Sequence, residues 1–323
     1  MNDFRLRSLL ETIRKGSFSS AAEYLGITQP AVSQHIKALE ESYGVQLIAK
    51  RKNRPVPTRE GMLLYRHAEK IEAAYRSIER DMHNASAAVH TYDIGATLTV
   101  GEYILPGLLV EHRRLHAETR IRLAIQNTNR IVERLLGSQI VLGLVEGPVE
   151  AAGVEVCTFG RDELVVVAAP DHPLVAKARR RGATLADLLA SELILREPGS
   201  GTRVVFERYL VGRGIDPRLL QPYMEIESIN TIKFLVRSRL GVSVISSLTV
   251  KEELREGSLV RVPLAGPPIV RELRFVWGES ADALFVRDFM EFCKASIERG
   301  QGGGSKGDGA APTAFAPPQM PVG

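Results

Sequence analysis

The sequence predicts a multi-domain chain in three parts: a small helical unit at the N-terminus, one long helix, and a C-terminal α/β region. Residues 16–38 predict two short helices around a glycine turn, and apolar residues within 59–89 recur with a period of 3.5. From Tyr92 onward, short apolar strands alternate with amphipathic helices. A chain of 323 residues is long enough for two or three domains.

The first part opens with a predicted helix over residues 3–15, in which apolar residues have helical spacing. Ser17 is a good N-cap for a second helix. Gly26 ends that helix, because glycine turns the chain through a positive φ without steric cost. Thr28 can then cap a third helix. Two helices joined by so tight a turn form a helix-turn-helix.

The outer face of the third helix is short, polar and rich in amides, which is the chemistry that reads base edges in a major groove. The predicted contacts to double-stranded DNA on this helix are Gln29, Pro30, Ala31, Ser33, Gln34 and Lys37. Residues 44–61 predict a small β-wing, in which Arg51 and Arg54 would contact phosphates or the minor groove. A solvated loop is the alternative for these two arginines. We therefore expect a winged helix-turn-helix DNA-binding domain over residues 1–60.

Residues 61–89 predict a long linker helix with alternating apolar spacings of four and three. That period specifies the seam of a left-handed coiled coil, whereas a helix that only faces a core would show a wider stripe. The seam residues assigned to dimerisation are Leu64, Ile71, Ile78 and Met82. A two-fold dimer presents two recognition helices, so the expected target is an inverted repeat.

The α/β region predicts open, parallel-type sheets with ligands at the carboxyl ends of the strands. Strands are expected over residues 93–98, 120–126, 140–145, 163–168, 193–195, 223–226, 242–245 and 273–277. A closing helix is expected over 281–297. Residues 299–323 are predicted to be a disordered tail, because glycine, proline and alanine offer little to bury.

Two strand-to-helix junctions in this region are candidate anion sites. Hydroxyl groups and unpaired N–H groups gather at each junction, where the start of a helix favours negative charge. The candidate binding residues are Thr97, Thr99, Asn127, Arg196, Ser200 and Thr202. Simple N-capping by Thr99 and Ser200 is the alternative.

Several function classes are disfavoured by what the sequence lacks. It has no nucleophile elbow, no metal-ligand cluster and no phosphate-binding loop with lysine, so we expect neither enzymatic activity nor a cofactor. The histidines considered for catalysis are interpreted as helix-surface residues (His112 and His116) and a loop residue (His172). The net charge of +4 excludes a histone-like protein. Two cysteines, Cys157 and Cys293, leave a thiol-redox sensor as an alternative.

Localisation is expected to be cytoplasmic. The N-terminus has no apolar signal-peptide core, and no apolar run approaches the roughly 20 residues that span a bilayer, so no membrane partner is expected. A solute-binding protein is disfavoured by the missing signal peptide and by the DNA-binding unit.

Together these features resemble the LysR-type transcriptional regulators up to about residue 298. The motifs that carry the resemblance are SFSSAAEYLGITQPAVSQHIKALE, GVQLI and PTREG. The resemblance implies a transcription regulator, with activation as the family tendency, that works as a homodimer or homotetramer and responds to a small effector. RNA polymerase is a further candidate partner. Ile48, Lys50, Pro57, Val141 and Arg239 depart from the family pattern; Arg239 stands where a helix-ending glycine is common.

The resemblance also implies an effector-binding domain over residues 90–298 that is similar to a periplasmic binding protein. The implied boundaries are about 91–162 with 268–298 for one α/β subdomain and about 163–267 for the other. Crossing strands near 161–164 and 263–269 would join them, and the effector would lie between them. The string LILREPGSGTR, with LGLVEGP before it, is similar to the branch associated with sulfite reduction, sulfur assimilation and selenium metabolism. A sulfur oxyanion or sulfur metabolite is the effector that this likeness implies.

Overall fold

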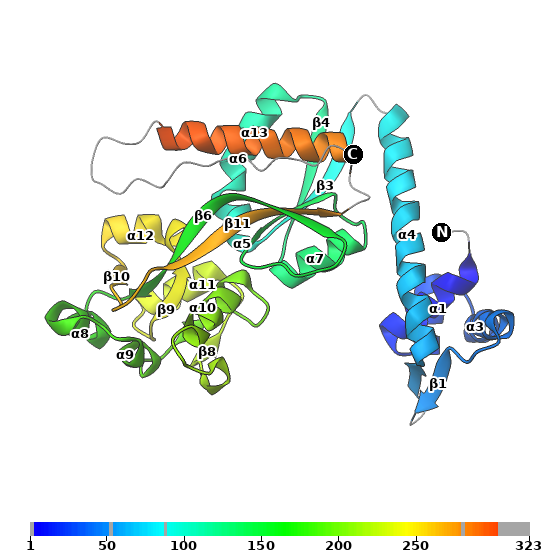
Figure 1. Ribbon diagram of the computed structural model, residues 1–323, viewed down its shortest axis with the longest axis horizontal. Coiled ribbons are helices and arrows are strands. Elements are labelled where there is room, and N and C mark those ends of the chain that lie inside the picture. Colours follow the sequence, from blue (N-terminus) through cyan, green and yellow to red (C-terminus); the bar gives the residue numbers. More distant parts are fainter. Residues whose placement is uncertain (1–2, 52–53, 87–88, 279–281, 303–323) are drawn as a thin grey trace.

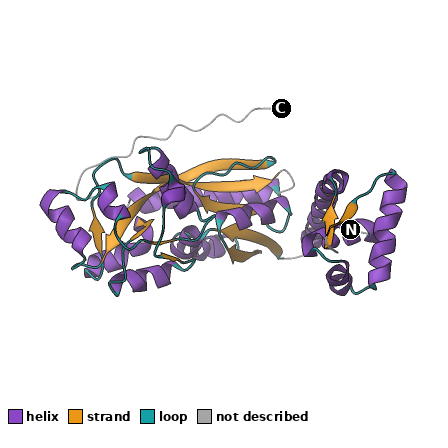
Figure 2. Ribbon diagram, turned by 90° about the horizontal axis from the view of Figure 1, so that it is seen from below, coloured by secondary structure: helices purple, strands orange, loops and turns teal. Residues whose placement is uncertain are grey.

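The computed structural model describes residues 3–51, 54–86, 89–278 and 282–302. The chain forms a small N-terminal helical domain, a long helix, and an α/β domain built around one large sheet (Figure 1). Figure 2 shows the helical domain at one end of the molecule and the α/β domain at the other.

The N-terminal domain is the predicted winged helix-turn-helix. Its elements are α1 (Phe4–Lys15), α2 (Phe18–Leu25), α3 (Gln29–Tyr43), β1 (Ile48–Arg51) and β2 (Arg54–Pro57). Ser17 accepts a hydrogen bond from the Ser20 backbone N–H, and Thr28 accepts one from Ala31. Gly26 has a φ of 67°, as the tight turn requires. The local capping chemistry therefore decides where these helices begin and end.

The long helix α4 (Arg59–Ser86) is anchored to the wing at its first turn. The Thr58 hydroxyl accepts a hydrogen bond from the Gly61 backbone N–H. A Cβ atom at Gly61 would lie 2.0 Å from the carbonyl oxygen of Leu47, so only glycine allows this approach. Ala68 is fully buried in the core of the N-terminal domain. The first turns of α4 thus belong to the DNA-binding domain as much as to the linker.

The sheet of the α/β domain has seven strands in the order β10-β6-β11-β5-β3-β4, with β9 paired to β6. Its strands are β3 (His90–Ala96), β4 (Thr119–Ile125), β5 (Leu142–Glu146), β6 (Val154–Ala168), β9 (Ser243–Ser246), β10 (Val260–Val262) and β11 (Ile269–Gly278). A separate parallel pair consists of β7 (Ile194–Leu195) and β8 (Met224–Glu225).

The expectation of parallel-type sheets is wrong for the centre of this sheet. Pairing is parallel between β3 and its neighbours β4 and β5, but β6 and β11 run antiparallel from Ile269↔Leu164 to Gly278↔Val154. The sequence predicted only the apolar part of each long strand, 163–168 and 273–277. The remaining residues alternate with polar side chains, so an apolar run could not reveal them.

The α/β domain has a hydrophobic core on each side of the middle of β6 and β11. Phe159 and Leu273 belong to the first core, whereas Leu164 and Ile269 belong to the second. Both strands therefore pass from one α/β unit to the other near residues 160–164 and 269–273, the second slightly later than expected. Arg239, at the predicted glycine position, has a φ of 67°.

Helices cover the two units. They are α5 (Leu98–Tyr103), α6 (Leu105–Leu115), α7 (Thr128–Leu136), α8 (Pro173–Arg181), α9 (Leu185–Leu189), α10 (Gly201–Val211), α11 (Ile229–Arg237), α12 (Lys251–Glu256) and α13 (Ala283–Gly302), with short 3₁₀ turns at Pro217–Leu219 and Ser247–Val250. The last helix continues to Gly302, so residues 299–302 are helical rather than tail. The remainder of the predicted disordered tail lies outside the described residues.

Candidate functional site

The residues predicted on the third helix to read DNA lie on α3. Val32, Ile36 and Leu39 are buried against the domain core. The opposite face exposes Gln29, Pro30, Gln34 and Lys37, while Ala31 and Ser33 are half-buried. The Gln29 amide donates a hydrogen bond to the Ser33 hydroxyl at 3.1 Å, so these two residues form one polar surface.

Two internal contacts hold this surface in place. The His35 imidazole lies 2.8 Å from the Ser8 hydroxyl of α1. The Glu40 carboxylate accepts hydrogen bonds from the backbone N–H groups of Leu47 and Ile48, at 2.8 and 3.1 Å. Because Glu40 lies on α3, it fixes the wing to the recognition helix. Rigid placement of this kind is what a base-reading surface requires.

The wing places Arg54 on an exposed position of β2. The side chain of Arg51 lies outside the described part of the chain, so its predicted contact stays a prediction. Lys37 is exposed and lies 3.6 Å from Glu41 of the same helix, a weak surface pair that a phosphate could replace.

The predicted seam on α4 divides into two parts. Leu64 packs against the core of the N-terminal domain, so this residue has a structural role within one chain. Ile71, Ile78 and Met82 are 42%, 56% and 63% exposed. Large apolar side chains at seven- and four-residue spacing on one long helix form a surface that a second helix could cover.

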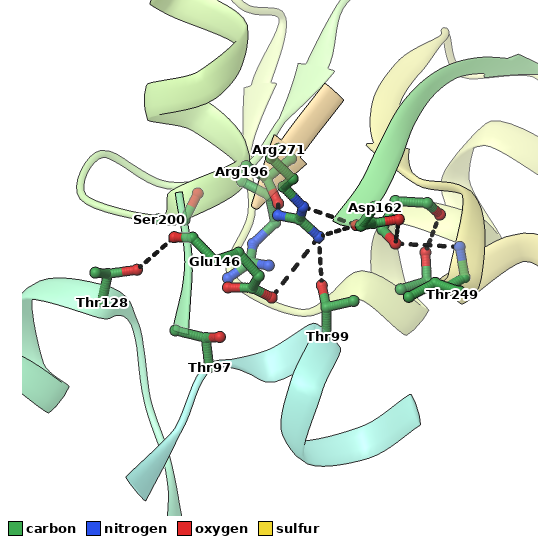
Figure 3. A network of polar contacts seen from close by, with 12 residues as sticks. Thr97, Thr99, Thr128, Glu146, Asp162, Arg196, Ser200, Thr249 and Arg271 are labelled. Atoms are coloured by element: carbon green, nitrogen blue, oxygen red, sulfur yellow. Dashed lines mark hydrogen bonds and ion pairs between the residues drawn. The ribbon is translucent and has the colours of Figure 1, made fainter. Parts of the chain in front are cut away.

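The candidate effector site is centred on Arg271, which is not among the residues predicted to bind an effector. The Arg271 side chain has no exposed surface, and its guanidinium donates to the Asp162 carboxylate at 2.7 Å (Figure 3). It also donates to the hydroxyls of Thr202 at 2.9 Å and Thr99 at 3.1 Å. Thr99 lies on α5 of the first unit and Thr202 on α10 of the second, so Arg271 links the two units.

Two carboxylates neutralise this arginine. Asp162 also accepts hydrogen bonds from the hydroxyls of Ser246, at 3.0 Å, and Ser247, at 3.5 Å. The Glu146 carboxylate is the more distant partner, at 3.7 Å from the Arg271 guanidinium. A buried charge is stable only when it is paired and hydrogen-bonded, and this cluster meets that condition.

The other predicted effector residues make local contacts, and two of them, Ser200 and Asn127, cap helices. The Thr97 hydroxyl donates to the carbonyl of Leu144 at 3.4 Å, and Ser200 caps α10 through the Arg203 N–H. Asn127 caps α7, outside the cluster. Arg196 is buried in an ion pair with Glu197, at 2.8 Å. The structure thus brings Thr99 and Thr202 together on one guanidinium, while capping explains Ser200 and Asn127.

A signal for Arg271 was available in the sequence. Ile269, Arg271, Leu273 and Phe275 occupy alternate positions of one strand, and all four are buried. A charged residue among apolar residues on the same face of a strand needs a buried partner. Asp162 and Glu146 could not be assigned as those partners, because their proximity depends on the pairing of β11 with β6 and β5.

The cysteines and histidines also differ in environment. Cys293 is buried, and burial raises the pKa of its thiol to about 12, so it stays protonated. Lys294 donates a hydrogen bond to the Sγ atom of Cys157 at 3.1 Å, a basic partner that the sequence did not reveal. His112 is buried rather than on the helix surface as expected, and desolvation together with His116 lowers its pKa to about 4. Among the described residues, no helix has the length and apolar character that crossing a bilayer needs.

Comparison with known proteins identifies both domains. Residues 4–62 match bacterial regulatory helix-turn-helix proteins of the lysR family, and residues 87–298 match the LysR substrate binding domain. The uncharacterized HTH-type transcriptional regulator YeiE of Escherichia coli (strain K12) is 31% identical over 290 residues, 90% of this chain and 96% of that protein. The HTH-type transcriptional regulator CysL of Bacillus subtilis (strain 168) is 31% identical over 264 residues, 80% of this chain and 85% of that protein.

A solved structure has the same arrangement of domains. Full-length CbnR in complex with its target DNA aligns with a TM-score of 0.59 and 20% identity, over 92% of this chain and 100% of that one. At this identity the likeness establishes the fold. With an exposed polar recognition helix and a two-unit α/β domain, the chain belongs to the LysR family of DNA-binding transcription regulators.

Proposed function

We propose that this regulator binds an inverted repeat as a dimer joined through α4 and assembles further to a tetramer. It activates transcription when a small anion binds between the two α/β units. The proposed effector is a sulfur oxyanion or a sulfur metabolite. This part of the proposal rests on the string LILREPGSGTR over residues 193–203. RNA polymerase is the partner that such an activator would contact.

The effector proposal rests on the buried guanidinium of Arg271. Arginine binds oxyanions through paired N–H donors. The Thr99 and Thr202 hydroxyls accept hydrogen bonds from Arg271, which leaves their own hydrogens to donate to a ligand. Glu146, at 3.7 Å, is the weakest partner of Arg271. An effector anion would therefore take the place of the Glu146 carboxylate.

Displacement of the Glu146 carboxylate by an anion would change the contact between the two α/β units. The first residue of α10, Gly201, lies so close to Glu146 that a Cβ atom there would be 2.3 Å from the Glu146 carbonyl oxygen. An anion that binds one closure state more tightly than the other shifts the population between them, by no more than its difference in affinity. The shift would alter the spacing of the two DNA-binding domains in the dimer.

The DNA and dimer parts are tested together. DNase footprinting with the wild-type protein should protect an inverted repeat, and effector should change the footprint. Ile78→Glu should convert the dimer to a monomer in sedimentation and weaken operator binding at least tenfold. Glu79→Ile provides the control, because Glu79 is exposed on the same helix outside the predicted seam. A dimer that survives Ile78→Glu would exclude the α4 seam, and a footprint that no bound ligand changes would exclude effector control.

The effector part is tested by thermal shift, because a ligand that binds only the native state raises the melting temperature. The panel contains sulfate, sulfite, thiosulfate, selenite, acetylserine and aromatic carboxylates. We expect a sulfur oxyanion to stabilise the wild type, to lose this effect with Thr202→Val, and to bind more tightly with Glu146→Gln, which removes the competing charge. Thr231→Val, at an exposed position of α11, is the control.

Stabilisation by aromatic carboxylates alone would exclude the sulfur class. Weaker binding with Glu146→Gln would show that this carboxylate does not compete with the effector.

A thiol-redox-sensing regulator of the same fold is the second candidate, and the contact between Lys294 and Cys157 favours it. Because Cys293 stays protonated, Cys157 is the thiol to test. Peroxide should change operator binding in the wild type and not in Cys157→Ser. An unchanged footprint after peroxide treatment would exclude this candidate.

A further inference from the structure

A polar pocket lies between the linker helix and the first α/β unit, away from the Arg271 cluster. Its volume is about 710 Å³. Four arginines from three elements line it: Arg76 of α4, Arg120 and Arg122 of β4, and Arg134 of α7. Glu79 and Asp93 are the carboxylates in the lining, so cationic side chains outnumber anionic ones.

Two of the four arginines already have strong partners. The Arg122 guanidinium binds Asp93 with two hydrogen bonds, one of them at 2.7 Å, and this pairing raises the pKa of Arg122. Arg76 donates to the carbonyl of Gly137 at 2.8 Å and lies 3.2 Å from Glu72. These contacts hold both side chains at the wall of the pocket.

The other two arginines have no such partners. Within the described residues, no carboxylate lies within 4.0 Å of the Arg120 or Arg134 guanidinium. The Nε atom of Arg134 is buried and donates to no acceptor. A buried donor without an acceptor is destabilising. The orphaned donor of Arg134, in a pocket that Arg120 also lines without a carboxylate partner, indicates a missing anionic acceptor.

We propose that this pocket binds a small polyanion with at least two phosphate or carboxylate groups. Planar guanidinium groups match the paired oxygens of both anions, and two unpaired arginines match two anionic groups. The lining residues of this pocket do not include Arg271, Thr99 or Thr202, so the site is separate from the Arg271 cluster. The proposal therefore does not depend on the effector proposed for that cluster.

The ligand would connect α4 to the α/β domain. Arg76 approaches the pocket from α4, whereas Arg134 comes from α7. At the end of α4, the Asn84 amide also contacts the backbone of Thr91, accepting from its N–H at 3.1 Å and donating to its carbonyl at 3.4 Å. An anion that bridges these elements would hold the linker helix, and with it the DNA-binding domain, against the α/β domain.

The test is calorimetric titration of the full chain with pyrophosphate and with citrate. We expect at least one of them to bind, and Arg120→Gln and Arg134→Gln each to weaken that binding at least tenfold. Arg120 is exposed, so its variant tests the site even where Arg134→Gln fails to fold. Binding of pyrophosphate alone would assign a phosphorylated ligand, and binding of citrate alone a polycarboxylate.

Two controls separate this site from others. Arg130 lies on α7 but outside the pocket lining, so Arg130→Gln should bind pyrophosphate and citrate like the wild type. Thr202→Val, at the Arg271 cluster, should also leave binding unchanged, whether or not that cluster binds its own effector. The proposal is overturned when neither probe binds or when Arg120→Gln binds like the wild type. It is also overturned when Arg130→Gln or Thr202→Val weakens binding as much as Arg120→Gln does.

Hydrogen exchange tests the connection to the linker. Pyrophosphate or citrate should slow amide exchange at least threefold in the second half of α4. Exchange that is unchanged at saturating ligand would overturn the bridging of α4.

Discussion

Arg271→Met is the substitution from which the structure allows the sharpest prediction. It keeps an unbranched side chain of similar length and removes the guanidinium. Asp162, whose side chain has no exposed surface, would then keep only the hydrogen bonds from Ser246 and Ser247. A buried carboxylate without its counter-charge is costly, because the surrounding protein cannot replace the water that solvates it in the unfolded chain.

Removing one partner of a buried ion pair costs about 3–5 kcal/mol. Domains are typically stable by about 5–15 kcal/mol, so a loss of this size is readily measured. We expect Arg271→Met to lower the free energy of unfolding by about 3–5 kcal/mol. Arg271→Met combined with Asp162→Asn should be more stable than Arg271→Met alone, because the second substitution removes the nearer of the two carboxylate charges that Arg271 neutralises.

The assay is urea unfolding followed by the fluorescence of Trp277, the one tryptophan of the chain, which lies on β11 with Arg271. Arg274→Met on the same strand is the control. Arg274 pairs with Glu272 at a partly exposed position and should cost less than about 1 kcal/mol. A loss below about 1 kcal/mol for Arg271→Met, or a double variant less stable than the single one, would contradict this prediction.

Three further predictions concern other parts of the chain. Gly61→Ala places a Cβ atom 2.0 Å from the Leu47 carbonyl oxygen, so it should lower the free energy of unfolding by at least about 2 kcal/mol and abolish operator binding. Gly107→Ala is the control and should be neutral or stabilising, because nothing lies within 4 Å of its Cβ position. Equal melting temperatures of the two variants would contradict this prediction. In the folded protein the pKa of His112 is lowered from 6.5 to about 4. As the pH falls, His112 is therefore protonated in the unfolded chain before it is protonated in the folded one, and up to roughly 3 kcal/mol of stability is lost between pH 6.5 and pH 4. His112→Phe should flatten this dependence in urea unfolding at stepped pH, and an unchanged slope would argue against it. Gln34→Ala should weaken binding to a selected operator by about 1–3 kcal/mol without changing binding to random DNA, as measured by fluorescence anisotropy; an equal loss on both would assign Gln34 to the DNA backbone.

Much of the N-terminal domain could be predicted because its signals are local. Ser17, Gly26 and Thr28 act on neighbouring backbone groups, and the structure confirms the helix boundaries that they predict. The outward position of Gln34 follows from the same helical periodicity. In the α/β domain the alternation of elements was recognised, but the antiparallel pairing of β6 with β11 was not, since the polar part of each strand has no apolar signature.

Local sequence patterns were enough to predict the three-part organisation and the recognition helix, and to select the hydroxyls of Thr99 and Thr202. The contact of both hydroxyls with Arg271 depends on the tertiary structure. Arg271 lies 172 positions from Thr99 and 109 from Asp162 along the chain, and the pairing of long strands brings them together. A buried charge needs a paired partner, and the fold, not the neighbouring sequence, determines which residues lie close enough to pair with it.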